Sequence, residues 1–308
     1  MARRRRGRPV HGWVVLDKPS GVTSTQAVGR VRRIFDAQKA GHGGTLDPLA
    51  SGLLPIALGE ATKTVAYVMA GIKTYRFTLQ WGIATSTDDA EGEIAARSEV
   101  RPERTQIEAV LPRFEGEIRQ VPPAFSAIKV AGERAYDLAR EGAAPELAPR
   151  PITIERLRLL DRPGPDLARF EAVSGKGAYM RALARDLGRA LGTFAHIREL
   201  RRTAVGPFAE ADAISLASLE ALGHSAAAFE HLLPVETALD DIPALALTET
   251  EAQRLRLGQA VSMLARANRD RIAELTNGEV ICAMAGEKLV ALARYEAGDL
   301  HPVRVLNL

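Results

Sequence analysis

The spacing of apolar residues along the chain predicts several amphipathic helices. Between residues 23 and 36, Val28, Val31 and Phe35 recur at intervals of three and four, which is the period of one helical face. The serine and threonine at the start of this segment can cap its first turn, because their hydroxyl oxygens accept hydrogen bonds from free backbone N–H groups. Further helices are predicted over residues 60–70, ending at a glycine, and over residues 176–191.

Other segments alternate between apolar and polar residues, which is the pattern of strands. In residues 75–81, three aromatic residues and a leucine alternate with polar residues, so the four large side chains share one face. Residues 85–92 are rich in turn formers and contain adjacent carboxylates, so they are predicted to form a loop. Two further strands are predicted at residues 152–160 and 168–174, joined by a turn at 162–165.

The pattern changes near residues 240–243, where we expect a domain boundary. Beyond it, Thr248 and Glu251 form a capping box for a short helix, and apolar runs at 280–284 and 289–293 flank a turn and predict a hairpin. The last sixty or so residues therefore read as a small β-rich module. The interleaved helices and strands before it favour a mixed α/β or α+β domain.

Charge points to a polyanionic partner. The 308 residues carry a formal net charge of only +3, yet the isoelectric point is about 9.1 and the arginines are clustered. Such clusters on a balanced background suit a polyanion bound on one face, although a solvated surface with a disordered basic tail explains them as well. The clusters are Arg3, Arg4, Arg5, Arg6 and Arg8; Arg30, Arg32 and Arg33; and Arg198, Arg201 and Arg202.

Several function classes are disfavoured. The apolar run after the basic start is too short for a signal peptide, and no apolar stretch is long enough to span a bilayer. Cys282 is the only cysteine, which excludes an internal disulfide and a thiol-rich metal site. We therefore expect a cytoplasmic protein that binds no metal.

Asp47 lies in a glycine-rich loop at residues 41–52 that is a candidate for chemistry. The spacing of its glycines resembles a phosphate cradle, but the lysine and hydroxyl residue of a P-loop do not follow. The dinucleotide fingerprint is also missing. From spacing alone, a turn cap before Pro48 is the favoured explanation of Asp47.

Six short segments change this interpretation. They read DKPSGVTS at 17–24, GHGGTLDPLASG at 41–52, GEATK at 59–63, VPPAFSAIK at 121–129, GKGAYMR at 175–181 and LRRT at 200–203. In this order they closely resemble the motifs of the bacterial tRNA pseudouridine-55 synthases, the TruB family. Six segments in register are hard to obtain by chance, and the resemblance extends from about residue 11 to residue 208.

The resemblance implies a fold and a domain arrangement. It implies the α+β pseudouridine synthase fold, in which a mixed, largely antiparallel central sheet is flanked by helices and loops. We expect residues 1–9 to form a disordered basic tail and residues 10–243 to form the catalytic domain. Residues 244–308 are expected to form a small β-rich RNA-binding domain of the PUA type.

The resemblance also implies the chemistry. The family uses one aspartate, here Asp47, to act at the sugar–base unit, either by covalent attack or by removing a sugar proton to give a glycal. Isomerisation involves no redox change and loses no group, so no cofactor or metal is required. Arg181 matches the cation that keeps the aspartate charged, and Asp89 matches a carboxylate that orients this arginine. Alternatively, Arg181 belongs to a solvated helix face with Arg185 and Arg189.

The same resemblance implies the substrate-binding residues. Tyr75 matches the tyrosine that stacks on the flipped base, Tyr179 and Leu200 match further base contacts, and His42 matches a residue placed against the RNA. Tyr75, Tyr179 and Leu200 are also explained as core residues. Lys18 is expected to support the Asp47 loop.

The implied partner is tRNA, which binds through its T-arm stem-loop. The protein is expected to be a monomer that uses no small-molecule cofactor and contacts no membrane. A non-catalytic RNA chaperone with the same fold is the alternative from another class. It is disfavoured because Asp47, Tyr75 and Arg181 are all present.

Overall fold

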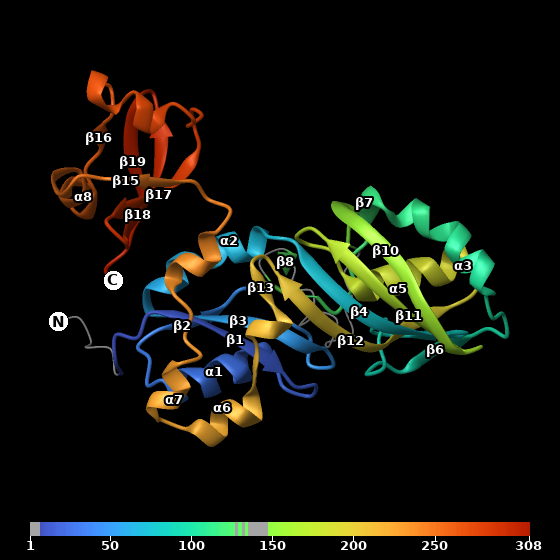
Figure 1. The fold of residues 1–308 in the computed structure, drawn as a ribbon. Coiled ribbons are helices and arrows are strands. Elements are labelled where there is room, and N and C mark those ends of the chain that lie inside the picture. Colours follow the sequence, from blue (N-terminus) through green and yellow to red (C-terminus); the bar gives the residue numbers. More distant parts are fainter. Residues whose placement is uncertain (1–6, 127–128, 131–132, 135–146) are drawn as a thin grey trace.

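The computed structural model describes residues 7–126, 129–130, 133–134 and 147–308. Ten of the described strands form one long sheet, in the order β14-β1-β3-β12-β4-β11-β10-β7, with β13 paired to β12 and β2 to β3 (Figure 1). Only the β1–β14 and β12–β3 pairs of this sheet are parallel. The predicted α+β class with a mixed, largely antiparallel central sheet is therefore confirmed. Its strands are β1 (Gly12–Lys18), β2 (Ala40–His42), β3 (Ser51–Leu58), β4 (Lys73–Trp81), β7 (Gly116–Gln120), β10 (Arg150–Gly164), β11 (Leu167–Ser174), β12 (Ala195–Val205), β13 (Phe208–Ala209) and β14 (Ile214–Ser215).

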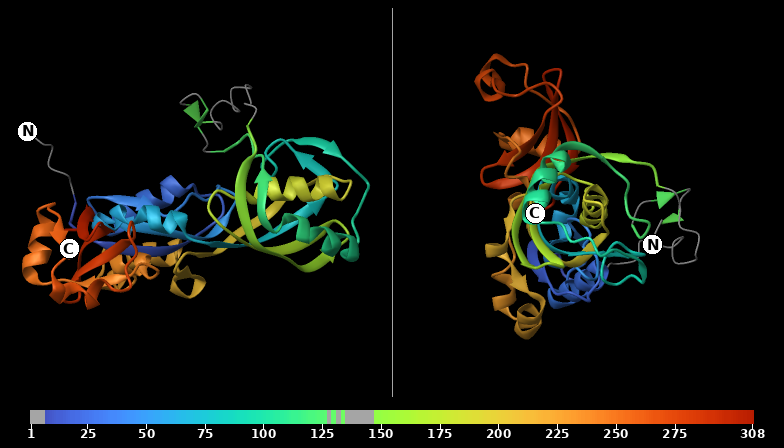
Figure 2. Two further views of the ribbon diagram at one scale, coloured as in Figure 1. Left: turned by 90° about the horizontal axis from the view of Figure 1, so that it is seen from above. Right: turned by 90° about the vertical axis from the view of Figure 1, so that its right-hand side faces the viewer.

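Helices cover the two halves of this sheet differently. Figure 1 shows α1 (Ser24–Ile34), α6 (Leu216–Leu222) and α7 (Ala226–Phe229) gathered beside β1 and β3. In the other half, α5 (Met180–Ala190) lies within the curve of β10 and β11, as Figure 2 shows, and α3 (Arg104–Val110) contacts β10. The smaller elements are β5 (Ile83–Thr85), β6 (Ile94–Arg97), β8 (Lys129–Val130), β9 (Glu133–Arg134) and the 3-10 helices η2 (Leu111–Phe114), η3 (Glu210–Asp212) and η4 (Val235–Leu239).

The predicted helix at residues 23–36 is confirmed with slightly shorter limits. Thr23 and Gln26 form a reciprocal capping box at the start of α1, and Val31 is fully buried. The helix ends at Ile34, and Asp36 adopts a positive φ of 47° that a continuing helix does not allow. In β4 the predicted apolar face is also confirmed, since Phe77, Leu79 and Trp81 belong to the core.

Two predicted helices have different limits in the structure. The segment 60–70 is divided into the 3-10 helix η1 (Gly59–Lys63) and α2 (Val65–Ala70), because the Thr64 hydroxyl donates to the Ala61 carbonyl at the junction. The helix predicted from residue 176 begins only at Met180. Gly177 has a φ of +85°, which interrupts helical geometry.

Three loop or tail predictions also need correction. The glycine-rich segment 41–52 is a loop only between β2 and β3, because its ends are paired in those strands. The turn predicted at 162–165 lies later, since β10 continues to Gly164. Of the predicted tail at residues 1–9, residues 1–6 lie outside the described residues. Arg8, by contrast, contacts the fold. Its backbone N–H donates to the Asp36 carbonyl over 2.6 Å, and its guanidinium lies 5.4 Å from the centre of the Phe229 ring.

The C-terminal part forms a second sheet beside α2 (Figure 1). Its order is β15-β17-β18-β19-β16, and the predicted hairpin at residues 280–293 is its β17–β18 pair. The strands and helices are β15 (Ala244–Ala246), α8 (Glu249–Arg256), β16 (Val261–Ser262), η5 (Arg266–Asn268), η6 (Asp270–Ile272), β17 (Val280–Ala285), β18 (Lys288–Glu296) and β19 (Asp299–Val305). The sheet is joined to the main domain by apolar packing and by hydrogen bonds from the Lys63 ammonium to the Val305 carbonyl and from the Asn307 N–H to Glu60. The module is β-rich as expected; its assignment to the PUA type stays a prediction.

The described part of the chain offers no helix long and apolar enough to cross a membrane. Within the same residues, no group of three or more histidine, cysteine, aspartate or glutamate side chains is arranged to hold a metal ion.

Glu251 provides a test of the stability of this module. It accepts two hydrogen bonds from Arg271 and one from the Thr248 N–H, and these contacts lower its pKa from 4.5 to about 2. A depressed pKa stabilises the folded state fully above the unfolded value, and this stabilisation is lost as the pH falls from about 4.5 toward 2. We expect Glu251→Gln to lower the free energy of unfolding by about 1–3 kcal/mol at pH 7.

Urea unfolding followed by circular dichroism at pH 7 and pH 3 measures this effect. The penalty of Glu251→Gln should shrink at pH 3, and a penalty equal at both pH values would contradict the linkage. Glu249→Gln is the matched control, because Glu249 lies on the same helix with a side chain that is 76% exposed.

Candidate active site

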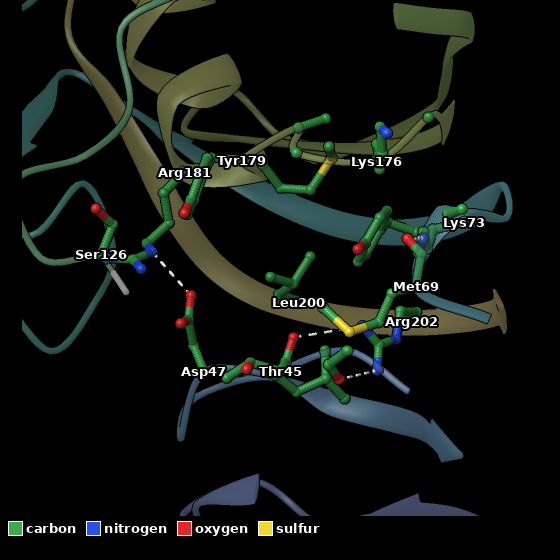
Figure 3. Close-up of a pocket in the computed structure, with 18 of the residues that line it drawn as sticks. Thr45, Asp47, Met69, Lys73, Ser126, Lys176, Tyr179, Arg181, Leu200 and Arg202 are labelled. Carbon is green, nitrogen blue, oxygen red and sulfur yellow. Dashed lines mark hydrogen bonds and ion pairs between the residues drawn. The ribbon is translucent and has the colours of Figure 1, made fainter. Parts of the chain in front are cut away.

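Asp47 and Arg181 form an ion pair across the middle of the long sheet. The Arg181 Nε lies 2.9 Å from Asp47 Oδ2, and Figure 3 shows the two side chains pointing toward each other. The Nε–H is not aligned for a hydrogen bond, so the contact is electrostatic. The side chain of Arg181 is only 6% exposed, whereas that of Asp47 is 37% exposed. A buried cation therefore holds a carboxylate that remains accessible to a substrate.

Arg181 is fixed by two loops that are distant in sequence. Its Nη1 donates to the Thr87 carbonyl over 3.2 Å, and its Nη2 donates to the Phe125 carbonyl over 2.9 Å. Its Nε also lies 3.6 Å from Asp89 Oδ2. Arg181 is thus not part of a solvated helix face, and the alternative of a surface arginine is wrong.

The structure separates the roles of two adjacent carboxylates. Asp89 is buried and faces Arg181, while Asp88 accepts a hydrogen bond of 2.9 Å from Arg185 Nη1. Burial raises the pKa of Asp88, and the two arginines oppose this rise. The sequence assigned Asp89 to Arg181 by resemblance alone, and the geometry agrees with that pairing.

A cavity of about 830 Å³ opens above this ion pair, within the range of about 300–1,000 Å³ of small-molecule sites. Asp47, Arg181, Tyr75, Tyr179 and Leu200 all line it. Five of the residues selected from the sequence are therefore brought together in one place, from β4, β12, the start of α5 and the loop before β3.

The aromatic and apolar lining residues serve both the cavity and the core. Leu200 is buried in the main core cluster and Tyr75 packs against it, while both also line the cavity. Their contact with a flipped base stays a prediction. Tyr75 is the third residue of β4 rather than its end residue. Burial raises the pKa of Tyr179, so its hydroxyl stays protonated at neutral pH.

Gln120 holds the backbone of Tyr179, and no sequence pattern had singled it out. Its Oε1 accepts from the Tyr179 N–H over 2.9 Å and its Nε2 donates to the Tyr179 carbonyl over 3.1 Å. Tyr179 is the N-cap position of α5. Because its backbone is held on both sides, the tyrosine and the following Arg181 have a defined position.

His42 is not brought into the cavity. It lies on β2 and is half-buried as a residue, and its buried Nδ1 has no hydrogen-bond partner. Burial and the nearby Arg202 lower the pKa of His42, so the ring is neutral at neutral pH. Its predicted place against the RNA stays a prediction.

The loop that carries Asp47 is held from several sides. Ser24 exchanges two hydrogen bonds with the backbone of Leu46, at 2.9 and 3.0 Å. The fully buried Lys18 donates to the carbonyls of Pro19, Val22 and Pro48, which confirms its supporting role. Burial lowers the pKa of Lys18 to about 8. The carboxylate of Asp47 is therefore presented by a rigid backbone.

These geometric findings agree with comparisons with known proteins. A profile described as TruB family pseudouridylate synthase (N terminal domain) matches residues 32–180, and one described as tRNA pseudouridylate synthase B C-terminal domain matches residues 181–240. The tRNA pseudouridine synthase B of Rhodospirillum rubrum is 57% identical over 308 residues, covering 100% of both chains. That of Bradyrhizobium diazoefficiens is 60% identical over 310 residues, covering 99% of this chain and 88% of the relative.

The chain belongs to the TruB family of pseudouridylate synthases. The resemblance predicted from the six motifs is confirmed, and this TruB-family protein is a pseudouridine synthase, an isomerase. A crystal structure of a Cbf5-Nop10-Gar1 complex contains a similar chain, with a TM-score of 0.71 and 27% identity over 96% of this chain and 84% of the other. A structure of an H/ACA RNP bound to a substrate RNA containing 2'-deoxyuridine shows the same fold, with a TM-score of 0.73, 24% identity, and coverage of 100% and 92%.

In this TruB-family protein three further basic residues line the cavity, Lys73, Lys176 and Arg202, and none of them was given a role there from the sequence. Lys73 is buried, its ammonium donates to the carbonyls of Met69 and Gly71, and burial lowers its pKa to about 8. Arg202 is also buried and donates to the carbonyls of Leu53 and Gly44 at 2.8 and 2.9 Å. Both lie at the end of the cavity away from Arg181 in Figure 3.

In the sequence, Arg202 belongs to the LRRT segment. Its hydrogen bonds to Leu53 and Gly44 depend on the pairing of β12 with β3. Gly52 pairs with Arg202 across the parallel β3–β12 contact and has a φ of +97°. A Cβ at this position would lie 2.2 Å from the Arg202 carbonyl oxygen, so only glycine fits. This close approach brings the arginine side chain beneath the Asp47 loop.

Proposed function

We propose that this TruB-family protein isomerises uridine 55 in the T-loop of tRNA, with Asp47 as the catalytic carboxylate and Arg181 as its cation. The observation that carries the proposal is the ion pair of 2.9 Å at a cavity lined by Tyr75, Tyr179 and Leu200. The relatives named tRNA pseudouridine synthase B, 57% and 60% identical, support tRNA as the substrate.

The reaction needs few groups. The bond between uracil N1 and ribose C1′ breaks, the uracil turns, and a new bond joins C5 to C1′. C5 loses a proton and N1 gains one, so the product is an isomer and atoms balance. Asp47 serves either as the nucleophile at C1′ or as the base that removes the C2′ proton to give a glycal. Deuterium at C2′ of the target uridine separates these routes, because only the second breaks that bond in a chemical step.

The target uridine has to leave its stacked position to reach Asp47, which costs a few kcal/mol. Tyr75 supports this step as a stacking platform, since base–aromatic contacts return about 1–3 kcal/mol per base. Tyr179 and Leu200 supply further contacts to the base, and His42, outside the cavity, contacts the RNA next to it. Arg181 is oriented by Asp89 over 3.6 Å as well as by two carbonyls.

We assign residues 10–243 to the catalytic domain and residues 244–308 to a PUA-like RNA-binding domain. Both family profiles end by residue 240, and the second sheet begins at Ala244. The arginine-rich start adds salt-sensitive attraction to phosphates. We further propose that the protein acts as a monomer in the cytoplasm, where unmodified tRNA is present, and uses no cofactor.

The test is incubation of purified protein with an unmodified tRNA transcript and with its isolated T-arm hairpin, without added metal or nucleotide. Pseudouridine-specific chemical mapping should show one modified site, at position 55, in both RNAs. A transcript with cytidine at this position should give no product. RNA binding without any product would contradict catalysis and favour the chaperone function, and a product elsewhere would contradict the T-loop assignment.

A further inference from the structure

A second arginine on α5 repeats the arrangement of Arg181 one helical turn away. Residues four apart lie on one helix face, so Arg181 and Arg185 point in the same direction. Arg185 Nη1 donates to Asp88 Oδ2 over 2.9 Å, and its Nη2 donates to the Val121 carbonyl over 2.7 Å. Its Nε donates to Asp186 over 3.0 Å.

The two arginines connect the same two loops. Arg181 binds the carbonyls of Thr87 in the first loop and Phe125 in the second. Arg185 binds the carboxylate of Asp88, next to Thr87, and the carbonyl of Val121, four residues before Phe125. Asp88 has a φ of 61°, and this left-handed turn lets the adjacent carboxylates of Asp88 and Asp89 both face α5. In an extended strand, successive side chains point to opposite faces.

The Arg185–Asp88 ion pair is largely buried. The side chains of Arg185 and Asp88 are 16% and 17% exposed. Ion pairs at exposed sites contribute little, but removing one partner of a buried pair leaves an uncompensated charge and forces its surroundings to rearrange. The surroundings here are the backbone of Thr87 on one side and the segment from Val121 to Phe125 on the other.

We propose that Asp88 and Arg185 are positioning residues for the isomerisation: they hold the two loops whose carbonyls hold Arg181, and so set the orientation of Asp47. The proposal rests on the proposed role of the Asp47–Arg181 pair. Neither residue lines the cavity, so neither touches the uridine. Their effect reaches Arg181 through the backbone of Thr87 and Phe125, together with the direct electrostatic interaction between Asp88 and Arg181.

This arrangement predicts a specific kinetic result. A displacement of about 1 Å at a reacting group costs as much as 10²-fold in rate. We expect Arg185→Met and Asp88→Asn each to lower kcat by about 10–100-fold while the KM for tRNA changes less than about threefold. Asp88→Asn keeps the shape of the side chain and its tolerance of positive φ, so it tests the charge without disturbing the turn.

The experiment measures kcat and KM on unmodified tRNA for Arg185→Met, Asp88→Asn, the double variant, Arg185→Lys and Arg189→Met. Arg189 lies one turn further along the helix with a side chain that is 69% exposed, so Arg189→Met should behave as wild type. The double variant should lose little more than either single variant, because both remove the same contact. Arg185→Lys should recover only part of kcat, since one ammonium does not reach three partners.

Thermal unfolding and Arg181→Met distinguish the ways in which the proposal can fail. If Arg185→Met has a wild-type kcat, or if its lost rate returns in proportion to the folded fraction at lower temperature, the positioning role is wrong. If Arg181→Met is itself fully active, the proposed function of the ion pair has failed, and the positioning role that rests on it is wrong as well. Additive losses in the double variant would also overturn the pairing.

Discussion

Replacement of Asp47 by asparagine should reduce pseudouridine formation by about 10⁴-fold or more, because no other carboxylate is among the described residues that line the cavity. Asparagine keeps the size of the side chain but is neither a nucleophile at C1′ nor a base at C2′. The affinity for tRNA should change less than about tenfold, since binding comes mainly from phosphate contacts outside the cavity. Single-turnover rates from chemical mapping and a filter-binding Kd measure the two quantities separately.

Asp47→Ala should give the same result, which shows that the effect does not depend on the new amide. The exposed Asp241→Asn serves as the control and should be fully active. A residual rate within tenfold of wild type in both Asp47 variants would show that Asp47 does not carry the chemistry.

Replacement of Arg181 by methionine should remove both activity and stability. It leaves the carboxylates of Asp47 and the buried Asp89 without the cation at 2.9 and 3.6 Å, and it leaves two backbone carbonyls without their donor. Breaking a buried ion pair costs about 3–5 kcal/mol, and losing a preorganised electrostatic partner costs about 10²–10³-fold in rate. We therefore expect a lower urea midpoint and a kcat reduced at least 10²-fold.

Single-turnover assays at a temperature where the variant is folded separate the two effects. Arg181→Lys should restore part of the stability by returning the charge, but less of the rate, because its single ammonium does not reproduce both hydrogen bonds together with the ion pair to Asp47. Arg189→Met is the control, because Arg189 lies near the C-terminal end of α5 with a side chain that is 69% exposed. A variant that is destabilised but fully active when folded would reduce Arg181 to a structural residue.

Much of the local structure was predictable because its causes lie within a few residues. The capping box of Thr23 and Gln26 defines the start of α1. The alternation in β4 predicts which face is buried, and the box of Thr248 and Glu251 defines α8. Two predicted helix limits were wrong because a single residue overrode the apolar periodicity. The Thr64 hydroxyl divides the helix predicted at residues 60–70, and the positive φ of Gly177 delays the start of α5.

The site was only partly predictable. Family resemblance selected Asp47, Tyr75, Tyr179, Arg181 and Leu200, and the structure brings all five to one cavity. His42 was also selected, but it lies outside that cavity. Lys73 and Gln120 were missed, because a lysine that binds helix carbonyls and a glutamine that binds a backbone have no distinctive local pattern.

By itself, the sequence determined the family, the aspartate at the centre of the chemistry and the elements on which the site is built. The tertiary structure alone decided how Asp47 is held. Arg181 reaches a carbonyl 94 residues away, Arg185 selects Asp88 over a separation of 97 residues, and Arg202 reaches Leu53 over 149. Periodicity and capping act within a few residues, whereas these contacts form only when strand pairing and the packing of α5 bring distant segments together.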